Sequence, residues 1–428
     1  MKQPTSIQFV FDKSRSLYKN LAVLLSGTVL AQLVNILASP ILSRVYEPDA
    51  FGIFGLYSAV GMVLSLPATL RYDLAIVLPD EDDDGVKLVH LAFVCLVLVS
   101  LALAVALAMG RVASGIAGLH VSEHWSWLWF VPGIVFARGV YVIATSWSMR
   151  KESFRDITTS RISQPVTTVT AQIAGGLAGL GSLGLVGGQL AGQVVASAVL
   201  VRMVLRRFAG MLLRRYDRSQ ILHIAKEYSQ FPLYSAPQSF VSLVSQYLPI
   251  FVFARFFDTV FVGYYTLMDR VVQLPLTIVG QAVREAFLPQ IVNAHRRGEA
   301  YQELKRMVFL LALVGGVPAA IIVPLAPALF SFVFGEEWRI AGVYAQVVAP
   351  YVVTAFVIPP ATSAMNALQQ QRWFAQYEFG KAIVSIVATV VGGVSQNPIL
   401  ALGLFSAVGV AAHLVLIAHA FRVAKRVA

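Results

Sequence analysis

The chain has 428 residues, of which 57% are hydrophobic and only 13% are charged. A soluble domain of average composition has about 45–50% apolar and about 25% charged residues, so an ordinary soluble enzyme, a disordered protein and a nucleic-acid-binding protein are all excluded. The net charge is +11, and in a membrane protein such an excess first sets the orientation of the helices. The single cysteine, Cys95, excludes a disulfide framework and a cysteine-rich metal site.

Twelve runs of the sequence are apolar and long enough to cross a bilayer as helices, since about 20 helical residues span its hydrocarbon core. The first run is too long for the apolar part of a signal peptide, so we interpret it as a retained transmembrane helix. The first six runs lie near 19–40, 52–77, 88–109, 125–147, 162–181 and 184–205. The second six lie near 233–254, 260–283, 306–334, 340–366, 378–395 and 398–421.

Lysines and arginines are shared very unevenly between the two ends of these helices. With the N-terminus on the cytoplasmic side, most of the 33 lysines and arginines fall in cytoplasmic segments. The outer segments carry Arg44, Arg111, Arg255 and Arg339. The helices themselves carry Arg71, Arg138 and Arg270. Because cytoplasmic loops of membrane proteins are rich in Lys and Arg, this distribution predicts both the helix count and an orientation with both termini inside.

The chain is therefore predicted to be an all-α polytopic membrane protein made of two parallel repeats. Six helices return the chain to its starting side, so both halves enter the membrane in the same orientation. We expect an N-terminal six-helix bundle over 1–205, a basic cytoplasmic linker over 206–232 and a C-terminal six-helix bundle over 233–428.

A short internal similarity supports the repeat. The spacing from Arg44 to Gly52, after the first helix, equals the spacing from Arg255 to Gly263, after the seventh. Both segments then continue to a Leu-Pro pair. The match is short, but it falls on equivalent helices of the two halves.

No set of residues predicts catalysis or metal binding. His120, Glu123 and His124 lie in H-V-S-E-H, which lacks the H-E-x-x-H order of a helical zinc motif. The outer loops are short, whereas an enzyme that polymerises sugars needs an outer loop to hold its acceptor. We therefore expect a protein that is not an enzyme and has no metal and no cofactor. The acidic run from Asp80 to Asp84 is interpreted as a solvated turn.

Charged residues inside the helices are the most informative candidates for function. A charge at the bilayer centre costs at least about 2.5–3.5 kcal/mol, so each such residue needs a partner or a wet cavity. Arg138 and Arg270 lie near the middle of the fourth and eighth helices, and they are predicted to bind an anion together with Arg71. Asp73 and Asp269 lie beside arginines, where each is either an ion-pair partner or part of a coupling-ion site.

Amide side chains recur along several helices. They can hold helices together by hydrogen bonds, or they can line a passage for a hydroxyl-rich substrate. Their number favours a wet interior. The candidate sugar contacts are Gln32, Asn35, Gln189, Gln193, Gln246 and Gln273.

The first helix is followed by L-S-R-V-Y-E-P-D-A-F-G-I-F-G-L-Y and then by L-R-Y-D-L-A-I-V-L-P before an acidic turn. This order resembles the Wzx-type flippases of lipid-linked oligosaccharides, which belong to the multidrug/oligosaccharidyl-lipid/polysaccharide exporter superfamily. The motifs cover about residues 20–90, and the six-plus-six helix pattern covers the whole chain.

The resemblance implies two bundles around a cavity of alternating access in the bacterial inner membrane. It also implies a substrate of undecaprenyl diphosphate carrying an oligosaccharide repeat unit, for polysaccharide or O-antigen biosynthesis. A diphosphate needs buried Arg or Lys. The family supplies no motif for these residues. Arg138 and Arg270 are chosen because of their charge and their position inside the helices.

Two other functions remain open. A small-molecule antiporter of the same superfamily would be expected to keep unpaired acids in its lumen, whereas the buried acids here lie beside arginines. A membrane-embedded glycan polymerase is disfavoured by the short outer loops. The expected partners are the lipid-linked substrate and membrane lipids, with the polysaccharide polymerase and chain-length machinery as further candidates, and no nucleic acid.

Overall fold

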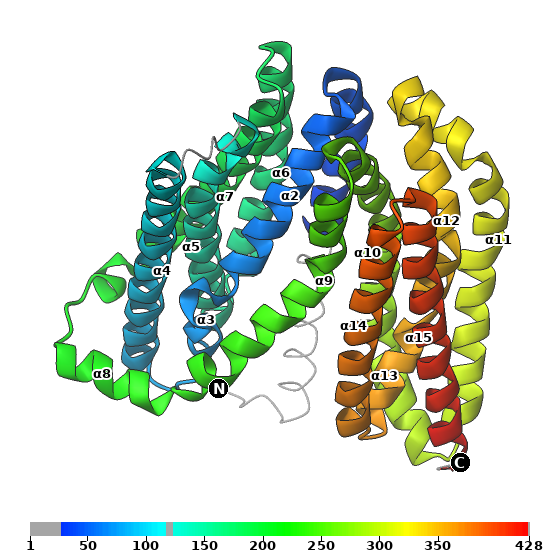
Figure 1. Cartoon of the computed structure of the whole chain (residues 1–428). Coiled ribbons are helices and arrows are strands. Elements are labelled where there is room, and N and C mark those ends of the chain that lie inside the picture. Colours follow the sequence, from blue (N-terminus) through cyan, green and yellow to red (C-terminus); the bar gives the residue numbers. More distant parts are fainter. Residues whose placement is uncertain (1–26, 117–122, 427–428) are drawn as a thin grey trace. The chain divides into compact units, whose positions relative to one another are not determined.

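The computed structural model describes residues 27–116 and 123–426. All regular secondary structure in these ranges is helical, which confirms the predicted fold class (Figure 1). Ten of the helices in these ranges are long and apolar enough to cross a membrane. The basic N-terminal residues and His120 of the H-V-S-E-H segment lie outside the described ranges.

The helices before the middle of the chain include three short ones. The long helices are Gly27–Val45, α2 (Pro48–Ser65), α4 (Asp82–Ile116), α5 (Val131–Arg150), α6 (Phe154–Leu177) and α7 (Ser182–Leu212). The shorter helices are η1 (Pro67–Thr69), α3 (Tyr72–Ala75) and α8 (Arg218–Glu227), with the turns η2 (Glu123–Phe130) and η3 (Phe231–Ser235).

The later helices are mostly long. They are α9 (Ala236–Phe256), α10 (Thr259–Arg296), α11 (Ala300–Phe334), α12 (Arg339–Val357), α13 (Pro359–Ala367), α14 (Gln371–Val394) and α15 (Pro398–Arg426), with the turn η4 (Glu336–Trp338) before α12. The ten apolar spans leave out α6 and α10, which are equally long but more polar. With these two, each of the twelve predicted runs overlaps a long helix of the described chain, although the runs 52–77 and 340–366 each cover more than one element.

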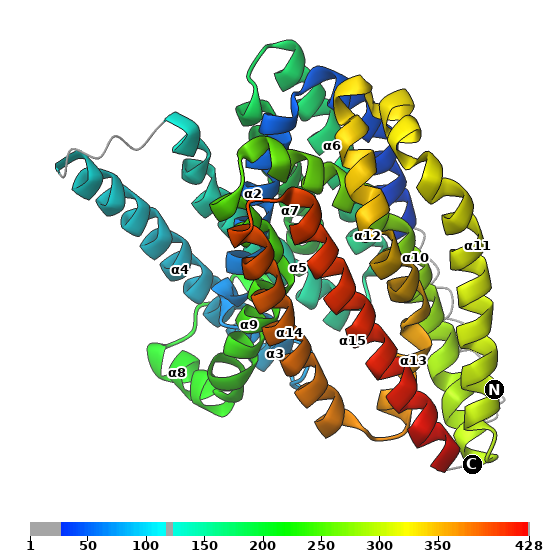
Figure 2. The same ribbon diagram turned by 45° about the vertical axis from the view of Figure 1, so that its right-hand side comes forward.

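The described chain divides into two compact units. The first comprises the residues up to Val45 and Tyr57–Val244, and the second comprises Tyr46–Leu56 and Ser245–Ala428. In the first unit α5 packs against α4 and α7, and α8 lies across the end of α4 (Figure 1). In the second unit α15 packs between α12 and α14 (Figure 2). The helix α2 contributes its first turns to the second unit and its later turns to the first.

The second predicted run, 52–77, is not one helix. The helix α2 ends at Ser65, two residues before Pro67, because a helix usually ends at or before the residue preceding a proline. After the single turn η1, Leu70 (φ 49°) and Arg71 (φ 62°) both adopt the left-handed conformation. This conformation is costly for residues with a side chain, so two in succession form a sharp break before α3.

The two segments whose similarity predicted the repeat meet inside the second unit. A Cβ atom added at Gly52 would overlap the carbonyl oxygen of Thr259, and one added at Gly263 would overlap that of Pro48. Pro48 precedes Gly52 by four residues, as Thr259 precedes Gly263. The two contacts are therefore one contact with the roles exchanged, which is the geometry of a two-fold relation.

Candidate functional site

The break after α2 places Arg71 and Asp73 together. The Arg71 Nη1 atom lies 3.6 Å from Asp73 Oδ2, and the hydroxyl of Thr69 donates to Asp73 Oδ1 at 2.5 Å. The Asp73 side chain is only 2% exposed. Among the described residues no acceptor reaches the buried Nε of Arg71. Asp73 thus has an ion-pair partner within its own segment, while anion binding by Arg71 stays a prediction.

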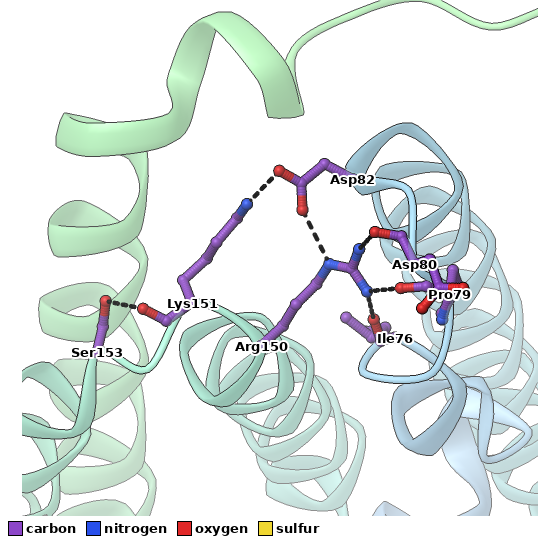
Figure 3. A network of polar contacts seen from close by, with 7 residues as sticks. All are labelled: Ile76, Pro79, Asp80, Asp82, Arg150, Lys151 and Ser153. Atoms are coloured by element: carbon purple, nitrogen blue, oxygen red, sulfur yellow. Dashed lines mark hydrogen bonds and ion pairs between the residues drawn. The ribbon is translucent and has the colours of Figure 1, made fainter. Parts of the chain in front are cut away.

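Arg150, the last residue of α5, holds the turn that joins α3 to α4 (Figure 3). Its Nη1 donates to the carbonyls of Ile76 at 3.1 Å and Pro79 at 2.6 Å, and its Nη2 donates to the carbonyl of Asp80 at 3.3 Å. Its Nε pairs with Asp82 at 3.1 Å. The side chain is 7% exposed. One planar guanidinium therefore fixes the whole turn on α5.

The acidic run is more than a solvated turn, so that prediction is wrong for Asp82, Asp83 and Asp84. These residues form the first turn of α4, where the helix dipole favours negative charge. Asp82 also pairs with Lys151. Lys87 lies 2.9 Å from Asp83 and 2.8 Å from Asp84. Their side chains are still partly exposed, but ion pairs hold them in place.

Arg138 lies half-buried in the middle of α5, and its Nη1 donates to the sulfur of Met62 on α2. Ser58, one helical turn before Met62, donates to Oε1 of Gln189 on α7 at 2.8 Å. Residues four apart share one face of a helix. Arg138 and Gln189, which the sequence singled out separately, therefore contact the same face of α2.

Gln193 lies four residues after Gln189 but has a different environment. It is 3% exposed, and its Oε1 accepts a hydrogen bond from Gln164 of α6 at 2.9 Å. Its Nε2 donates to Ser197 at 3.5 Å, and the Ser197 hydroxyl lies 2.7 Å from the carbonyl of Ala137 on α5. These bonds hold α5, α6 and α7 together, so Gln193 fits helix packing better than contact with a sugar.

The other selected amides have fewer contacts. Gln32 and Asn35 are half-buried in the first described helix. The main-chain carbonyl of Asn35 accepts a hydrogen bond from the hydroxyl of Ser39 at 2.8 Å. Gln246 is exposed on α9. Among the described residues, no hydrogen bond is seen for the side chain of Gln32 or Gln246.

In the second unit, α10 carries Asp269, Arg270 and Gln273. The Gln273 amide donates to Asp269 Oδ1 at 3.3 Å. Arg270 is half-buried and lies next to Asp269 along the helix, so the two side chains leave the helix in different directions. The structure thus joins two of the selected residues, Asp269 and Gln273, on one face.

The sequence pattern did not single out the buried His413 of α15 as a candidate. The side chain is 5% exposed, and Nδ1 lies 2.9 Å from the hydroxyl of Thr354. Its ring stacks on Tyr351 with centroids 5.1 Å apart. Gly409, one turn earlier, leaves room for the Tyr351 ring. The glycine-to-histidine spacing was visible in the sequence, but its aromatic partner was not.

A family model described as polysaccharide biosynthesis protein matches residues 41–341. The chain belongs to this polysaccharide biosynthesis protein family. The match confirms the family that the motifs after the first helix predicted. Within this member of the family, the matched segment includes Arg71, Arg138, Arg150 and Arg270.

Solved transporters share the fold of this polysaccharide biosynthesis protein. The lipid II flippase MurJ in an inward closed conformation has a TM-score of 0.69 at 13% identity, over 96% of this chain and 90% of that chain. An inward-facing multidrug resistance MATE transporter of the MOP superfamily has a TM-score of 0.60 at 12% identity, over 94% of each chain. The MATE transporter VcmN of Vibrio cholerae has a TM-score of 0.55 at 14% identity, over 96% of this chain and 97% of that chain.

At these identities the likeness establishes the fold alone. No curated protein sequence matches the chain. Family and fold together make this a multi-pass membrane protein of the polysaccharide biosynthesis family, with a fold shared by the MurJ and MATE structures.

Proposed function

We propose that this protein is a flippase that moves undecaprenyl-diphosphate-linked oligosaccharide repeat units from the cytoplasmic to the outer leaflet of the bacterial inner membrane. The observation that carries the proposal is Arg138, a cation in the middle of a membrane span of a polysaccharide biosynthesis family member. A buried cation is costly in a membrane unless an anion or wet cavity compensates it. The family and the fold shared with a lipid II flippase support an anionic lipid-linked glycan as a ligand of Arg138 in addition to its contacts within the protein.

The surroundings of Arg138 suit a substrate that joins phosphate to sugar. The guanidinium can donate two parallel hydrogen bonds to phosphate oxygens. Gln189 and Ser58 lie one turn away along the same face of α2, and they supply an amide and a hydroxyl of the kind that sugars bind. Arg71, with its buried Nε, is a second cation of the same unit.

The transport cycle we propose is alternating access between two six-helix bundles, with both termini in the cytoplasm. Arg138 belongs to the first unit and Arg270 to the second. Alternating access requires a site that binds its substrate on one side of the membrane and releases it on the other.

The direct test follows the substrate in cells that lack the protein. We expect these cells to accumulate lipid-linked repeat units that face the cytoplasm and to lose surface glycan, with both defects reversed by the intact chain. Repeat units that reach the outer leaflet but stay unpolymerised would instead identify a polymerase. Normal glycan with increased sensitivity to small cationic compounds would identify an antiporter.

A purified system separates the protein's own activity from that of the cell. A fluorescent undecaprenyl-diphosphate sugar should become accessible to an external quencher faster in proteoliposomes than in vesicles without the protein. Equal rates with and without the protein would overturn the proposal.

A further inference from the structure

The segment between the membrane spans α7 and α9 is held firmly on the first unit. Tyr216 donates to Asp83 at 2.7 Å, and Nε2 of His90 lies 2.8 Å from the Leu212 carbonyl. Burial and the hydrogen bond to Asp83 raise the pKa of Tyr216 to about 12, so its hydroxyl stays a donor. These contacts fix the position of the segment on the first unit.

The helix α8 within this segment has one packed face. It begins with a capping box between Asp217 and Gln220. Ile224 is 3% exposed, and α8 packs on α4. The hydroxyl of Tyr72 donates to the carbonyl of Ala225 at 3.1 Å. Apart from Ile224, the residues of α8 are exposed or half-buried.

Exposed cations recur along the chain from the last three turns of α7 to the end of α8. Two of the arginines of this region are matched by acids, since Arg207 lies 2.9 Å from Asp156 and Arg214 lies 3.7 Å from Asp83. Five exposed cations have no ion pair with any residue of the described ranges. These five, which we call the cationic strip, are Arg202, Arg206, Arg215, Arg218 and Lys226.

Exposed apolar side chains lie among these cations. Leu213 is 71% exposed and Leu222 is 50% exposed. The apolar span of α7 ends at Leu212 and the next one begins at Phe231, so 213–230 lies where the chain leaves and re-enters the membrane. Cations combined with exposed leucines at this level are typical of a helix that lies in the membrane surface. An acidic soluble protein would match the charge but would not account for the leucines.

We infer that the cationic strip, with Leu213 and Leu222, is a binding surface for anionic phospholipid headgroups of the surrounding leaflet. The arginines and the lysine attract the phosphates, and the two leucines enter the acyl region beneath them. This surface is separate from Arg138 and does not depend on which substrate is transported.

The test measures retained lipid on the purified full-length protein by native mass spectrometry, with phosphatidylglycerol compared to phosphatidylcholine. The test variant replaces Arg202, Arg206, Arg215, Arg218 and Lys226 with Gln. The control variant makes the same charge change at exposed cations of the second unit, namely Lys305, Arg306, Arg422, Lys425 and Arg426. We expect at least tenfold weaker phosphatidylglycerol binding in the test variant and less than threefold weakening in the control.

Two further variants separate the contribution of the charges from that of the leucines. Replacing the four arginines of the strip with Lys retains the charge and should retain binding even if the Gln variant folds poorly. Leu213→Ser combined with Leu222→Ser should weaken the retention of phosphatidylglycerol while leaving the strip charged. Equal losses in test and control variants, or no preference for phosphatidylglycerol, would overturn the inference. Displacement of the lipid by inorganic pyrophosphate at matched concentration would point to a phosphate site and also overturn it.

Discussion

Arg138 places a positive charge in the middle of α5 at a face of α2 that also receives Gln189. We expect Arg138→Lys to retain partial transport, because charge remains while the planar fork is lost. Arg138→Glu should abolish transport, because it places a like charge against the diphosphate. The measurement is surface glycan display, normalised to the amount of protein in the membrane.

The matched control is Arg155→Glu, which makes the same charge change at an exposed residue of α6. It should leave glycan display within about twofold of the intact chain, since exposed charges interact weakly. Full display by Arg138→Glu would remove Arg138 from the mechanism and leave it as a structural residue.

Asp269 accepts a hydrogen bond from Gln273, so its role is expected to be local. Asp269→Asn keeps the shape and the ability to bond Gln273, and it should reduce transport less than Arg270→Ala does. Transport rates in proteoliposomes, with equal protein incorporation, decide the order. Complete loss in the Asn variant of a normally inserted protein would show a coupling-ion site, and an imposed proton or sodium gradient would then identify the ion.

Among the elements, the turn from α3 to α4 depends most clearly on one side chain. Arg150→Ala removes bonds to three carbonyls and an ion pair, of which the two bonds to Ile76 and Pro79 are part-buried. A loss of about 1–3 kcal/mol of stability is expected, because partly buried acceptors are left unsatisfied. Thermal unfolding of the detergent-purified protein should show a clearly lowered midpoint.

Lys151→Ala is the matched comparison for Arg150. It removes the neighbouring partner of the same Asp82, but its side chain is more exposed and bonds no carbonyl of the turn. Its midpoint should fall much less. Equal effects of the two substitutions would show that the turn is held mainly by the charge of Asp82 rather than by the fork of Arg150.

At the scale of the whole molecule, α2 has residues in both units. Its first turns cross α10 at Gly52 and Gly263, where the Thr259 hydroxyl bonds Asp49, and its later turns contact α5 and α7. A cycle that moves one bundle against the other must bend α2 or change one of these sets of contacts. We expect the crossing with α10 to part, because its contacts at Gly52 and Gly263 are between main chains.

A disulfide between Asp49→Cys and Thr259→Cys, made in a Cys95→Ala background, tests this expectation. Oxidation should stop transport and a reductant should restore it. The control pair is Ser58→Cys with Gln189→Cys, a similar polar contact of α2 that lies wholly inside the first unit. That pair should transport when oxidised, and an active cross-linked 49–259 pair would show that α2 and α10 stay together throughout.

The sequence predicted the membrane class and the twelve long helices because apolar runs of about 20 residues are a strong signal. Pro67 also indicates where the second run breaks. The left-handed conformation of Leu70 and Arg71 is seen only in the structure. The clamp at Arg150 could not be predicted, because its partners are main-chain carbonyls that any residue type supplies.

The candidate site was predictable to a lesser degree. The cost of burial singled out Arg138, but nothing in the sequence separated Gln189 from Gln193, since both lie on one helix face four residues apart. Only packing distinguishes them: Gln189 contacts Ser58 of α2, while Gln193 is enclosed by α6 and α5. The ion pairs of Asp82 could not be predicted, because its partners Arg150 and Lys151 are distant in the chain.

The reciprocal contact of Gly52 and Gly263 has a consequence for how the two halves of the gene can change. A larger residue at either position widens the same helix crossing, so both contacts are lost together. After a duplication, most positions of the two copies are free to drift apart, but these two remain tied to each other. A second substitution that compensates for a change at Gly52 is therefore expected in the second half of the gene, near Thr259, as readily as in the first.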